Sequence, residues 1–342
     1  MKPFERRKFL QSLVTVSAAA GLGNISLAKA QSIQTPAGAN SNRFKISLNA
    51  YSFNAPLTKG TTNLDAAIDF CAKENFDAID ITGYYFPGYP EVPSDEYIYH
   101  VKRKAHQLGL EISGTGIRNE FAEPDKAKRV TEITFVKRWI EVAAKLGAPV
   151  IRIFTGKNLP ANYTWEKVEE WIIEDIKTCV EYGKQHGVIV AVQNHNDFIK
   201  TADQMIDVIK KVNSEWFGLI LDTGSFVTLE PYSEIKKTAD YAVNWQVKEK
   251  LNYNGKSENM DLEKLFTIVR DSSYRGYLPI ETLYEFLAIT FSKAALTCFK
   301  NGGTMRKGSP GESVSIGKYP RYEESRTIVN NFSRSIFSDL PL

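Results

Sequence analysis

The stretch Gly187–Asn196 reads G-V-I-V-A-V-Q-N-H-N and is the part of the sequence that most directly predicts the fold. A glycine able to end a helix is followed by five apolar residues, and the run then ends in four polar ones. An unbroken run of Val, Ile and Ala is typical of a strand buried on both faces of a parallel sheet. Barrels and open α/β enzymes carry their catalytic groups at the C-terminal ends of such strands. We therefore expect functional side chains among Gln193–Asn196.

Outward from this stretch, the same order of apolar strand, polar residues and helix recurs along the chain. The pattern predicts seven more strands, at Phe44–Phe53, Phe76–Ile81, Leu110–Ile117, Pro149–Phe154, Phe217–Leu221, Tyr241–Val247 and Gly276–Ile280. Apolar residues at helical spacing predict helices at Asn63–Glu74, Ser94–Gly109, Asp125–Leu146, Thr164–His186, Ala202–Val212, Tyr232–Thr238, Asp261–Arg270 and Phe286–Phe299. Eight β-then-α units with short connections indicate an α/β fold, a (β/α)₈ TIM barrel in a single domain. A doubly wound open sheet stays an alternative, because the number of strands does not prove closure.

The first 30 residues have the features of a twin-arginine export signal and are set apart from the fold. They hold the pair Arg6-Arg7, an Ala-rich apolar run and the small-x-small sequence Ala28–Ala30 just before Gln31. Glycines interrupt the apolar run, so we expect no stable membrane span. An uncleaved anchor helix is the alternative. The signal predicts a periplasmic or otherwise exported protein.

The remaining chain divides into three parts by composition. Residues 31–43 are rich in Ser, Ala, Asn and Gly and predict a flexible leader, and residues 44–301 carry the barrel pattern. Residues 302–342 have no clear period and predict an irregular tail that either wraps the barrel or mediates self-association. The sequence therefore leaves open whether the chain forms an oligomer. Cys71 and Cys179 lie among apolar neighbours in helical patterns and are predicted to be buried free thiols.

Charge and motifs exclude several classes of function. The chain holds 43 Lys and Arg and 40 Asp and Glu, but five of the basic and one of the acidic residues lie in residues 1–30. The rest of the chain therefore has 38 basic and 39 acidic residues, a formal charge of −1. Without a basic stripe, nucleic acid is not an expected partner. The sequence has no phosphate-binding glycine motif and no nucleophile elbow, so nucleotide cofactors and serine hydrolysis have no support.

Polar residues gather at the C-terminal ends of the predicted strands, which in a barrel meet at one mouth. These residues are Asn49, Tyr51, Asp80, Arg118, Glu120, Gln193, His195, Asp222, Gln246, Lys248 and Glu281. The set is rich in oxygen atoms, which suits a hydroxyl-rich small molecule such as a carbohydrate. The aromatic loop at Tyr84–Tyr89 is either a surface for sugar stacking or a packed flap.

Four of the strand ends also carry a resemblance to a known family. They read V-A-V-Q-N-H at residues 190–195, L-I-L-D-T-G at 219–224, W-Q-V-K-E at 245–249 and Y-L-P-I-E-T-L at 277–283. In this order and spacing they resemble the xylose isomerase-like TIM-barrel superfamily, which includes sugar phosphate isomerases and epimerases and is related to endonuclease IV. The resemblance covers about Phe44–Leu283 and is specific for the fold, not for the substrate.

The resemblance implies a site for one divalent metal ion. Members of that superfamily hold the ion with a Glu of strand five, an Asp of strand six, a His of strand seven and a Glu of strand eight. Asp222 and Glu281 match two of these ligands, whereas Gln193 stands in place of the Glu and Gln246 in place of the His. Two carboxylates and two amide oxygens suit Mg²⁺ or Mn²⁺ better than Zn²⁺, or no metal at all.

The resemblance further implies proton transfer next to the carbonyl of a sugar or polyol derivative. Because Gln193 is an amide, Glu281 is the one carboxylate of the expected acid–base pair, with His195 and Lys248 as further catalytic candidates. The expected substrate-binding residues are Asn49, Tyr51, Arg118, Glu120 and Gln193. A metal-free lyase or dehydratase acting on a keto-sugar and a non-catalytic carbohydrate-binding barrel are the alternatives.

Overall fold

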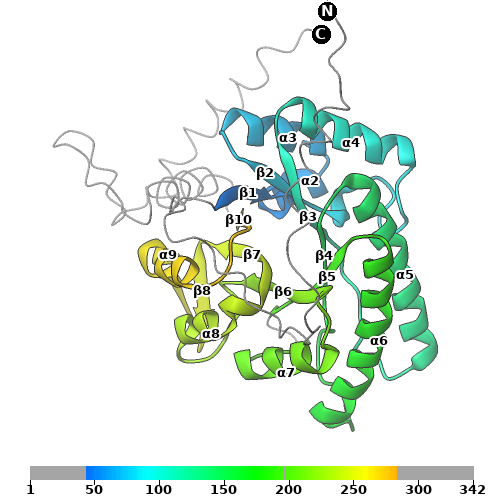
Figure 1. Cartoon of the computed structure of the whole chain (residues 1–342), viewed down its shortest axis with the longest axis vertical. Coiled ribbons are helices and arrows are strands. Elements are labelled where there is room, and N and C mark those ends of the chain that lie inside the picture. Colours follow the sequence, from blue (N-terminus) through cyan, green and yellow to red (C-terminus); the bar gives the residue numbers. More distant parts are fainter. Residues whose placement is uncertain (1–43, 196–197, 283–342) are drawn as a thin grey trace, which may run out of the picture. The chain divides into compact units, whose positions relative to one another are not determined.

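The computed structural model describes residues 44–195 and 198–282 (Figure 1). The predicted signal, leader and tail, the helix expected at Phe286–Phe299 and the third cysteine, Cys298, lie outside the described residues. Cys71 and Cys179 are buried free thiols, as predicted, and burial raises the pKa of both.

Eight parallel strands form a closed barrel. They are β1 (Lys45–Asn49), β2 (Ala78–Thr82), β3 (Glu111–Gly116), β4 (Val150–Ile153), β5 (Ile189–Gln193), β6 (Phe217–Asp222), β7 (Ala242–Lys248) and β10 (Tyr277–Glu281). Their order around the barrel is β1-β10-β7-β6-β5-β4-β3-β2. The ring closes where β1 pairs in parallel with β10, in the register Ile46 to Leu278. This pairing confirms the predicted TIM barrel and excludes the open sheet.

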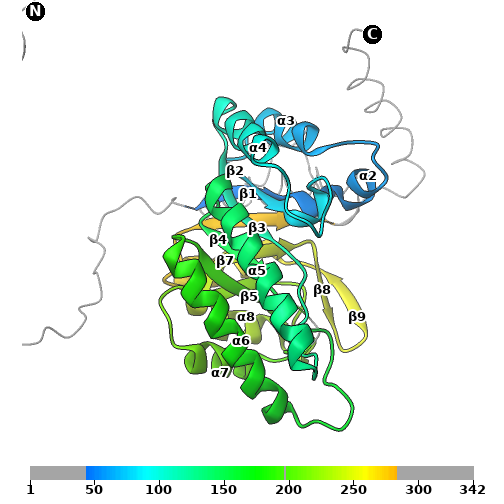
Figure 2. The same ribbon diagram turned by 90° about the vertical axis from the view of Figure 1, so that its right-hand side faces the viewer.

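Helices cover the outside of the barrel (Figures 1 and 2). They are α2 (Asn54–Thr58), α3 (Leu64–Lys73), α4 (Asp95–Gln107), α5 (Lys126–Leu146), α6 (Trp165–Gln185), α7 (Ala202–Val212), α8 (Pro231–Thr238) and α9 (Leu262–Asp271). The long helices α5 and α6 lie side by side in Figure 2. Among the described residues, none of the helices is both long enough and apolar enough to cross a bilayer.

Local sequence explains where several of these helices begin and end. Ser94 and Asp125 cap α4 and α5, where each side chain accepts a hydrogen bond from a backbone N–H of the first turn. Thr201 and Gln204 form a capping box at the start of α7. Gly147 ends α5 with a φ of 83°, a left-handed conformation that glycine adopts without steric cost.

The core is divided between the outside and the inside of the barrel. One large apolar cluster packs the strands against the helices. A small second cluster consists of Val150, Ala191 and Ile220, which lie two residues before Arg152, Gln193 and Asp222 in the same three strands. Because side chains alternate along a strand, both sets point to the same side of the sheet, and the apolar set forms a floor beneath the polar one.

The structure differs from the sequence-based expectation at two places. The first strand ends at Asn49, four residues early, because the Asn49 side chain accepts the backbone N–H of Tyr51 and starts a 3₁₀ turn at Ala50–Phe53. The apolar spacing in α5 predicts one buried face formed by Val130, Ile133, Val136, Ile140, Ala143 and Leu146. Val130 is instead 52 % exposed, and its neighbour Arg129 is buried. Arg129 pairs with Asp175 of α6 at 2.7 Å, so an ion pair is buried at this end of the helix.

A hairpin that the strand count did not include follows β7. β8 (Lys250–Tyr253) and β9 (Lys256–Asn259) are antiparallel and form their own two-stranded sheet. Asn254 and Gly255 link them with φ values of 46° and 71°. Two positive φ values are those of a type I′ turn, for which Asn-Gly is the preferred sequence. Figure 2 shows the hairpin as a separate arm beside the barrel strands.

Two glycines of β3 make room for charged side chains inside the barrel. A Cβ atom at Gly114 would lie 2.6 Å from Oδ2 of Asp80, and one at Gly116 would lie 2.7 Å from Nε of Arg152. Glycine is unfavourable in a strand, where it adds entropy to the unfolded chain and packs no side chain. Its use here follows from the space that Asp80 and Arg152 require.

We expect Gly116→Ala to lower the free energy of unfolding by about 1–3 kcal/mol, since the added methyl group overlaps the Arg152 side chain. Urea denaturation measures the loss. In an Arg152→Ala background the same substitution should cost clearly less, because Nε and Cζ of Arg152 are gone and only its Cβ, at 3.0 Å, remains close. Equal costs in both backgrounds would contradict this explanation of the glycine.

Candidate active site

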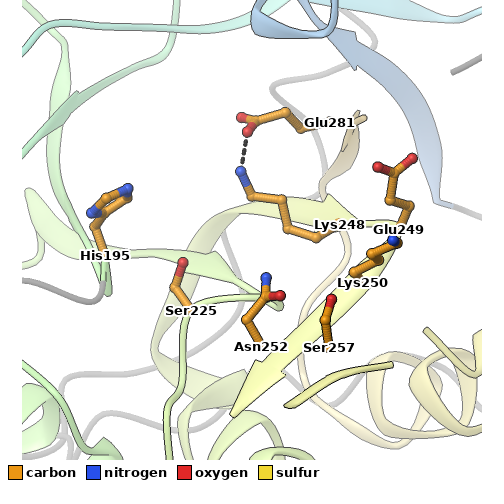
Figure 3. A pocket seen from close by; sticks show the side chains of 9 residues that line it. His195, Ser225, Lys248, Glu249, Lys250, Asn252, Ser257 and Glu281 are labelled. Atoms are coloured by element: carbon orange, nitrogen blue, oxygen red, sulfur yellow. Dashed lines mark hydrogen bonds and ion pairs between the residues drawn. The ribbon is translucent and has the colours of Figure 1, made fainter. Parts of the chain in front are cut away.

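A pocket of about 280 Å³ opens at the C-terminal ends of the strands. Its walls come from the ends of β5, β6, β7 and β10 and from the β8–β9 hairpin. The lining residues are His195, Gly224, Ser225, Lys248, Glu249, Lys250, Asn252, Ser257 and Glu281. Figure 3 shows His195 on one side of the pocket, with Lys248 and Glu281 facing it from the other.

A row of hydrogen bonds links three neighbouring strands behind this pocket. Arg152 of β4 donates from Nη1 to Oε1 of Gln193 at 3.1 Å, and Gln193 of β5 donates from Nε2 to Oδ2 of Asp222 at 2.6 Å. Asp222 of β6 also accepts the backbone N–H of Gly224 on Oδ1 at 2.9 Å. An amide is the group that can accept from a guanidinium and donate to a carboxylate at once. The row therefore explains why residue 193 is Gln.

Lys248 lies between two buried carboxylates. Its Nζ donates to Oε1 of Glu281 and lies 3.6 Å from Oδ2 of Asp222. Asp222 is fully buried and Glu281 is 2 % exposed. Burial acts to lower the pKa of Lys248, but the two carboxylates outweigh it, so the pKa lies above its ordinary value. The ammonium group thus stays charged at neutral pH.

Oε2 of Glu281 and Oε1 of Gln246 are among the buried side-chain oxygen atoms that have no hydrogen-bond partner in the part of the chain that the structure describes. Gln246 lies beside Asp222 in the register of β6 and β7, and Lys248 lies beside Glu281 in that of β7 and β10. A buried acceptor without a donor costs free energy, and a ligand that brings hydroxyl groups would remove this cost.

Asp80 of β2 lies deeper in the barrel than the pocket. It accepts hydrogen bonds from Nδ2 of Asn49 at 3.3 Å and from Nδ2 of Asn244 at 3.4 Å. Burial raises its pKa to about 7, with a smaller rise from Glu281 and an opposing effect of Arg152. The carboxyl group of Asp80 therefore changes between its protonated and ionised forms near neutral pH.

The aromatic loop after β2 is mostly packed, but Tyr84 reaches the row of hydrogen bonds formed by Arg152, Gln193 and Asp222, which we call the charged row. The hydroxyl of Tyr84 accepts a hydrogen bond from Nη2 of Arg152 at 2.8 Å, and its ring lies edge-on to Tyr51 at 6.4 Å. Phe86 is buried against Trp139 with ring centroids 5.8 Å apart. The loop is thus a packed flap at Phe86, while Tyr84 forms part of the mouth.

The structure separates the predicted substrate-binding residues into two groups. Gln193 and Tyr51 lie in or next to the charged row, and Asn49 is buried beneath it with hydrogen bonds to Asp80, Thr82 and Tyr51. The other group consists of Arg118 and Glu120, which lie on loops around the mouth. None of the five predicted substrate-binding residues is among the lining residues of the pocket.

Arg118 and Glu120 interact instead with the loops around the mouth. Arg118 is exposed, and its guanidinium lies over the ring of Phe154 at 5.5 Å. The carboxylate of Glu120 accepts backbone N–H groups of Ala122 and Lys157 and so shapes a loop. Their predicted roles in substrate binding stay untested.

The donor set does not fit a divalent ion as the side chains are arranged here. The oxygen of Gln193 accepts from Arg152, its NH₂ group faces Asp222, and Lys248 lies between the two carboxylates. A positive ion between the two carboxylates would lie against the ammonium group of Lys248, and like charges at such a distance repel. The described residues contain no group of three or more His, Cys, Asp or Glu that could hold a metal ion.

Two features of the mouth, Arg152 and the β8–β9 hairpin, were not selected from the sequence. Arg152 interrupts the apolar strand V-I-R-I with a charge, and such a charge points to the inner face of a barrel. The hairpin wall was signalled by Asn254-Gly255 between alternating residues.

Comparisons with known proteins agree with this architecture. A family model described as "Xylose isomerase-like TIM barrel" matches residues 68–294. No curated protein sequence matches the chain. The solved structures described below share less than a fifth of their residues with it, so they bear on the fold alone.

Three of these structures illustrate the likeness. D-Psicose 3-epimerase from Clostridium cellulolyticum H10, solved with D-tagatose, has 18% identity and a TM-score of 0.61 over 77% of this chain and 100% of its own. The 3-keto-D-glucoside 4-epimerase YcjR from E. coli has 13% identity and a TM-score of 0.58 over 75% and 99%. The IOLI protein, solved with a zinc atom, has 16% identity and a TM-score of 0.60 over 76% and 99%.

We expect Gln193→Glu to lower the free energy of unfolding by about 3 kcal/mol at neutral pH, because two carboxylates would then face each other in the barrel. The loss should shrink at about pH 5, where protonation restores a donor toward Asp222. Urea denaturation at the two pH values measures both effects. The exposed Gln107→Glu is the control and should change stability by less than about 0.5 kcal/mol. A pH-independent cost at residue 193 would contradict the role of its NH₂ group.

Asp80 should make the folded protein less stable as the pH rises. Its pKa is about 7 when folded and about 4 when unfolded, so between these values the folded state binds more protons and stability falls with rising pH. From about pH 5 to about pH 8 the wild type should lose about 3 kcal/mol relative to Asp80→Asn. Urea denaturation of both proteins across this range tests the difference, and parallel pH profiles would refute it.

Proposed function

Because the chain belongs to the xylose isomerase-like TIM barrel family, we propose that it is an enzyme that moves a proton next to the carbonyl of a sugar or polyol derivative. The observation that carries this proposal is the pair of Glu281 and Lys248, a buried carboxylate and an ammonium group in contact at the wall of one pocket. A base and a cation at one point are what enolate-forming chemistry requires.

The size and lining of the pocket support a small hydroxylated ligand. Its volume of about 280 Å³ lies near the lower end of the range of ~300–1,000 Å³ found for ligand pockets. Eight of its nine lining residues carry polar or charged side chains. Two of the solved structures with this fold are sugar epimerases, which agrees with a carbohydrate substrate.

In the mechanism that we propose, Glu281 is the base. Its Oε2 atom takes the proton from the carbon next to the substrate carbonyl, while Oε1 stays hydrogen-bonded to Lys248. The negative charge that develops on the carbonyl oxygen is stabilised by the ammonium of Lys248, which remains protonated. A substrate oxygen near Nζ and the adjacent carbon near Oε2 would meet both groups at once.

The fate of the proton separates two candidate reactions. His195 lies across the pocket from Glu281, where it can return a proton to the opposite face of the carbon and complete an epimerisation (Figure 3). The second candidate, elimination by a lyase or dehydratase, needs one base. It is favoured by Gln193, whose amide is engaged by Arg152 and Asp222 and supplies no second carboxylate.

The β8–β9 hairpin is the part of the pocket that we assign to substrate selection. Asn252 and Ser257, which pair with each other across the hairpin, both line the pocket. Their amide and hydroxyl groups can donate and accept hydrogen bonds with sugar hydroxyls. They lie on the hairpin, whereas Glu281 and Lys248 lie at the ends of barrel strands.

The proposal of export rests on the sequence alone, and a metal ion is not part of the proposed mechanism. We propose export through the twin-arginine pathway to the periplasm on the sequence of residues 1–30 alone. One structural relative was solved with zinc, but this mouth lacks the His and one of the carboxylates that the family resemblance implies for a metal site. The mechanism above therefore routes no step through a metal ion.

We expect the wild type to exchange hydrogen of at least one ketose with deuterium from the solvent, and Glu281→Gln to lose at least about 100-fold of that rate. Proton NMR of a panel of ketoses in D₂O measures the exchange, and thermal unfolding shows whether the variant is folded. Glu181→Gln on the exposed face of helix α6 is the matched control and should exchange at the wild-type rate.

The outcomes of this experiment distinguish the candidate functions. Full exchange in Glu281→Gln would refute the assignment of the base. Exchange accompanied by loss of water from the substrate would favour the lyase. Binding of a sugar by the wild type with no exchange in any member of the panel would favour a barrel that only binds carbohydrate.

A further inference from the structure

The two carboxylates that the family resemblance implies as metal ligands have a lysine between them. We propose that the ammonium group of Lys248 is the resident cation of this site and that it takes the place of a divalent metal ion. This inference goes beyond the proposed function, because it concerns which cation neutralises Asp222 and Glu281. Its test needs no substrate, so its failure and that of the proposed reaction are distinguishable.

The position of Lys248 is the first observation that supports the inference. Its Nζ is hydrogen-bonded to Oε1 of Glu281 and lies 3.6 Å from Oδ2 of Asp222, and its side chain is 18% exposed. A metal ion shared by these two carboxylates would have to occupy the space that the ammonium group fills. The lysine is anchored by the barrel itself, because β7 pairs with β10 in the register Lys248 to Glu281.

The orientation of Gln193 is the second observation. Its carbonyl oxygen, the atom that would ligate a metal ion, accepts the hydrogen bond of Arg152, while its NH₂ group points at Asp222. Reversing this amide would place its NH₂ group against the guanidinium and its oxygen against a carboxylate, which are repulsive contacts. Gln193 therefore supports Asp222 as a hydrogen-bond donor and supplies no ligand.

The charge of the site is the third observation. Two carboxylates, Asp222 and Glu281, stand against two cations, Arg152 and Lys248, and all four side chains are largely buried. Asp80 is a third buried acid and interacts with Arg152 and Glu281. A divalent ion added to this set would leave at least one uncompensated positive charge even with Asp80 ionised, and such a charge is costly away from water. Without the lysine, the same residues would hold an excess of negative charge toward the pocket.

Removing the ammonium group should therefore create a metal site. In Lys248→Met, the two carboxylates and the oxygen of Gln246 become free to bind one ion that keeps several of its waters, as Mn²⁺ and Mg²⁺ do. Lys248→Arg keeps the positive charge and is the matched control.

The experiment measures Mn²⁺ binding to the purified full chain by calorimetry and by thermal unfolding with and without a chelator. We expect the wild type and Lys248→Arg to bind no Mn²⁺ at this site and to keep their Tm on chelation. Lys248→Met should bind one Mn²⁺ per chain and gain about 5 °C in Tm when Mn²⁺ is at about 100 times its Kd.

Two results would overturn the inference. One is a folded Lys248→Met protein that binds Mn²⁺ no better than the wild type. The other is a wild-type protein that holds one divalent ion per chain and loses it on Asp222→Asn. If Lys248→Met does not fold, the wild-type measurement with its Asp222→Asn counterpart decides alone, since an unmodified site without an affinity for Mn²⁺ is what the inference requires.

Discussion

The contact of Lys248 with Asp222 and Glu281 is the interaction on which the chemistry of this barrel depends. A charged group removed from water is stable only with a partner of opposite charge or with hydrogen bonds. At the mouth, five strands each contribute one member to a continuous row, from Arg152 through Gln193 and Asp222 to Lys248 and Glu281. Each side chain in the row gives its neighbour a hydrogen-bond partner or an opposite charge. The residue type at one position therefore restricts the residue type at the next.

The scaffold below the row is adapted to these charges. The apolar floor of Val150, Ala191 and Ile220 separates the row from the far end of the barrel. Gly114 and Gly116 leave β3 without side chains where Asp80 and Arg152 need space. Because closure of the barrel brings β10 against β1 and β7, Glu281 is held within reach of Lys248. Fold and site thus share one set of contacts.

Prediction from the sequence succeeded where the signal is local or periodic. Strands such as I-V-A-V-Q show their burial directly, and α4 begins directly after Ser94, where the sequence predicts the start of this helix. Prediction failed where a tertiary partner decides the outcome. Val130 was expected to be buried, but the neighbouring Arg129 is buried because Asp175 on the next helix pairs with it. The hairpin was missed although Asn254-Gly255 marks its turn.

The sequence by itself determined the eight β-then-α units and their polar strand ends, among them Gln193, Asp222, Lys248 and Glu281, because alternation along strands and helical periodicity are properties of consecutive residues. Only the tertiary structure decided what those residues do to one another. Gln193 reads in the sequence as a weakened metal ligand, yet in the barrel its amide joins Arg152 to Asp222. Lys248 reads as one more polar strand end, yet it lies between two carboxylates. The electrostatics of a buried site depend on distances between residues far apart in the chain, and closing the barrel sets those distances.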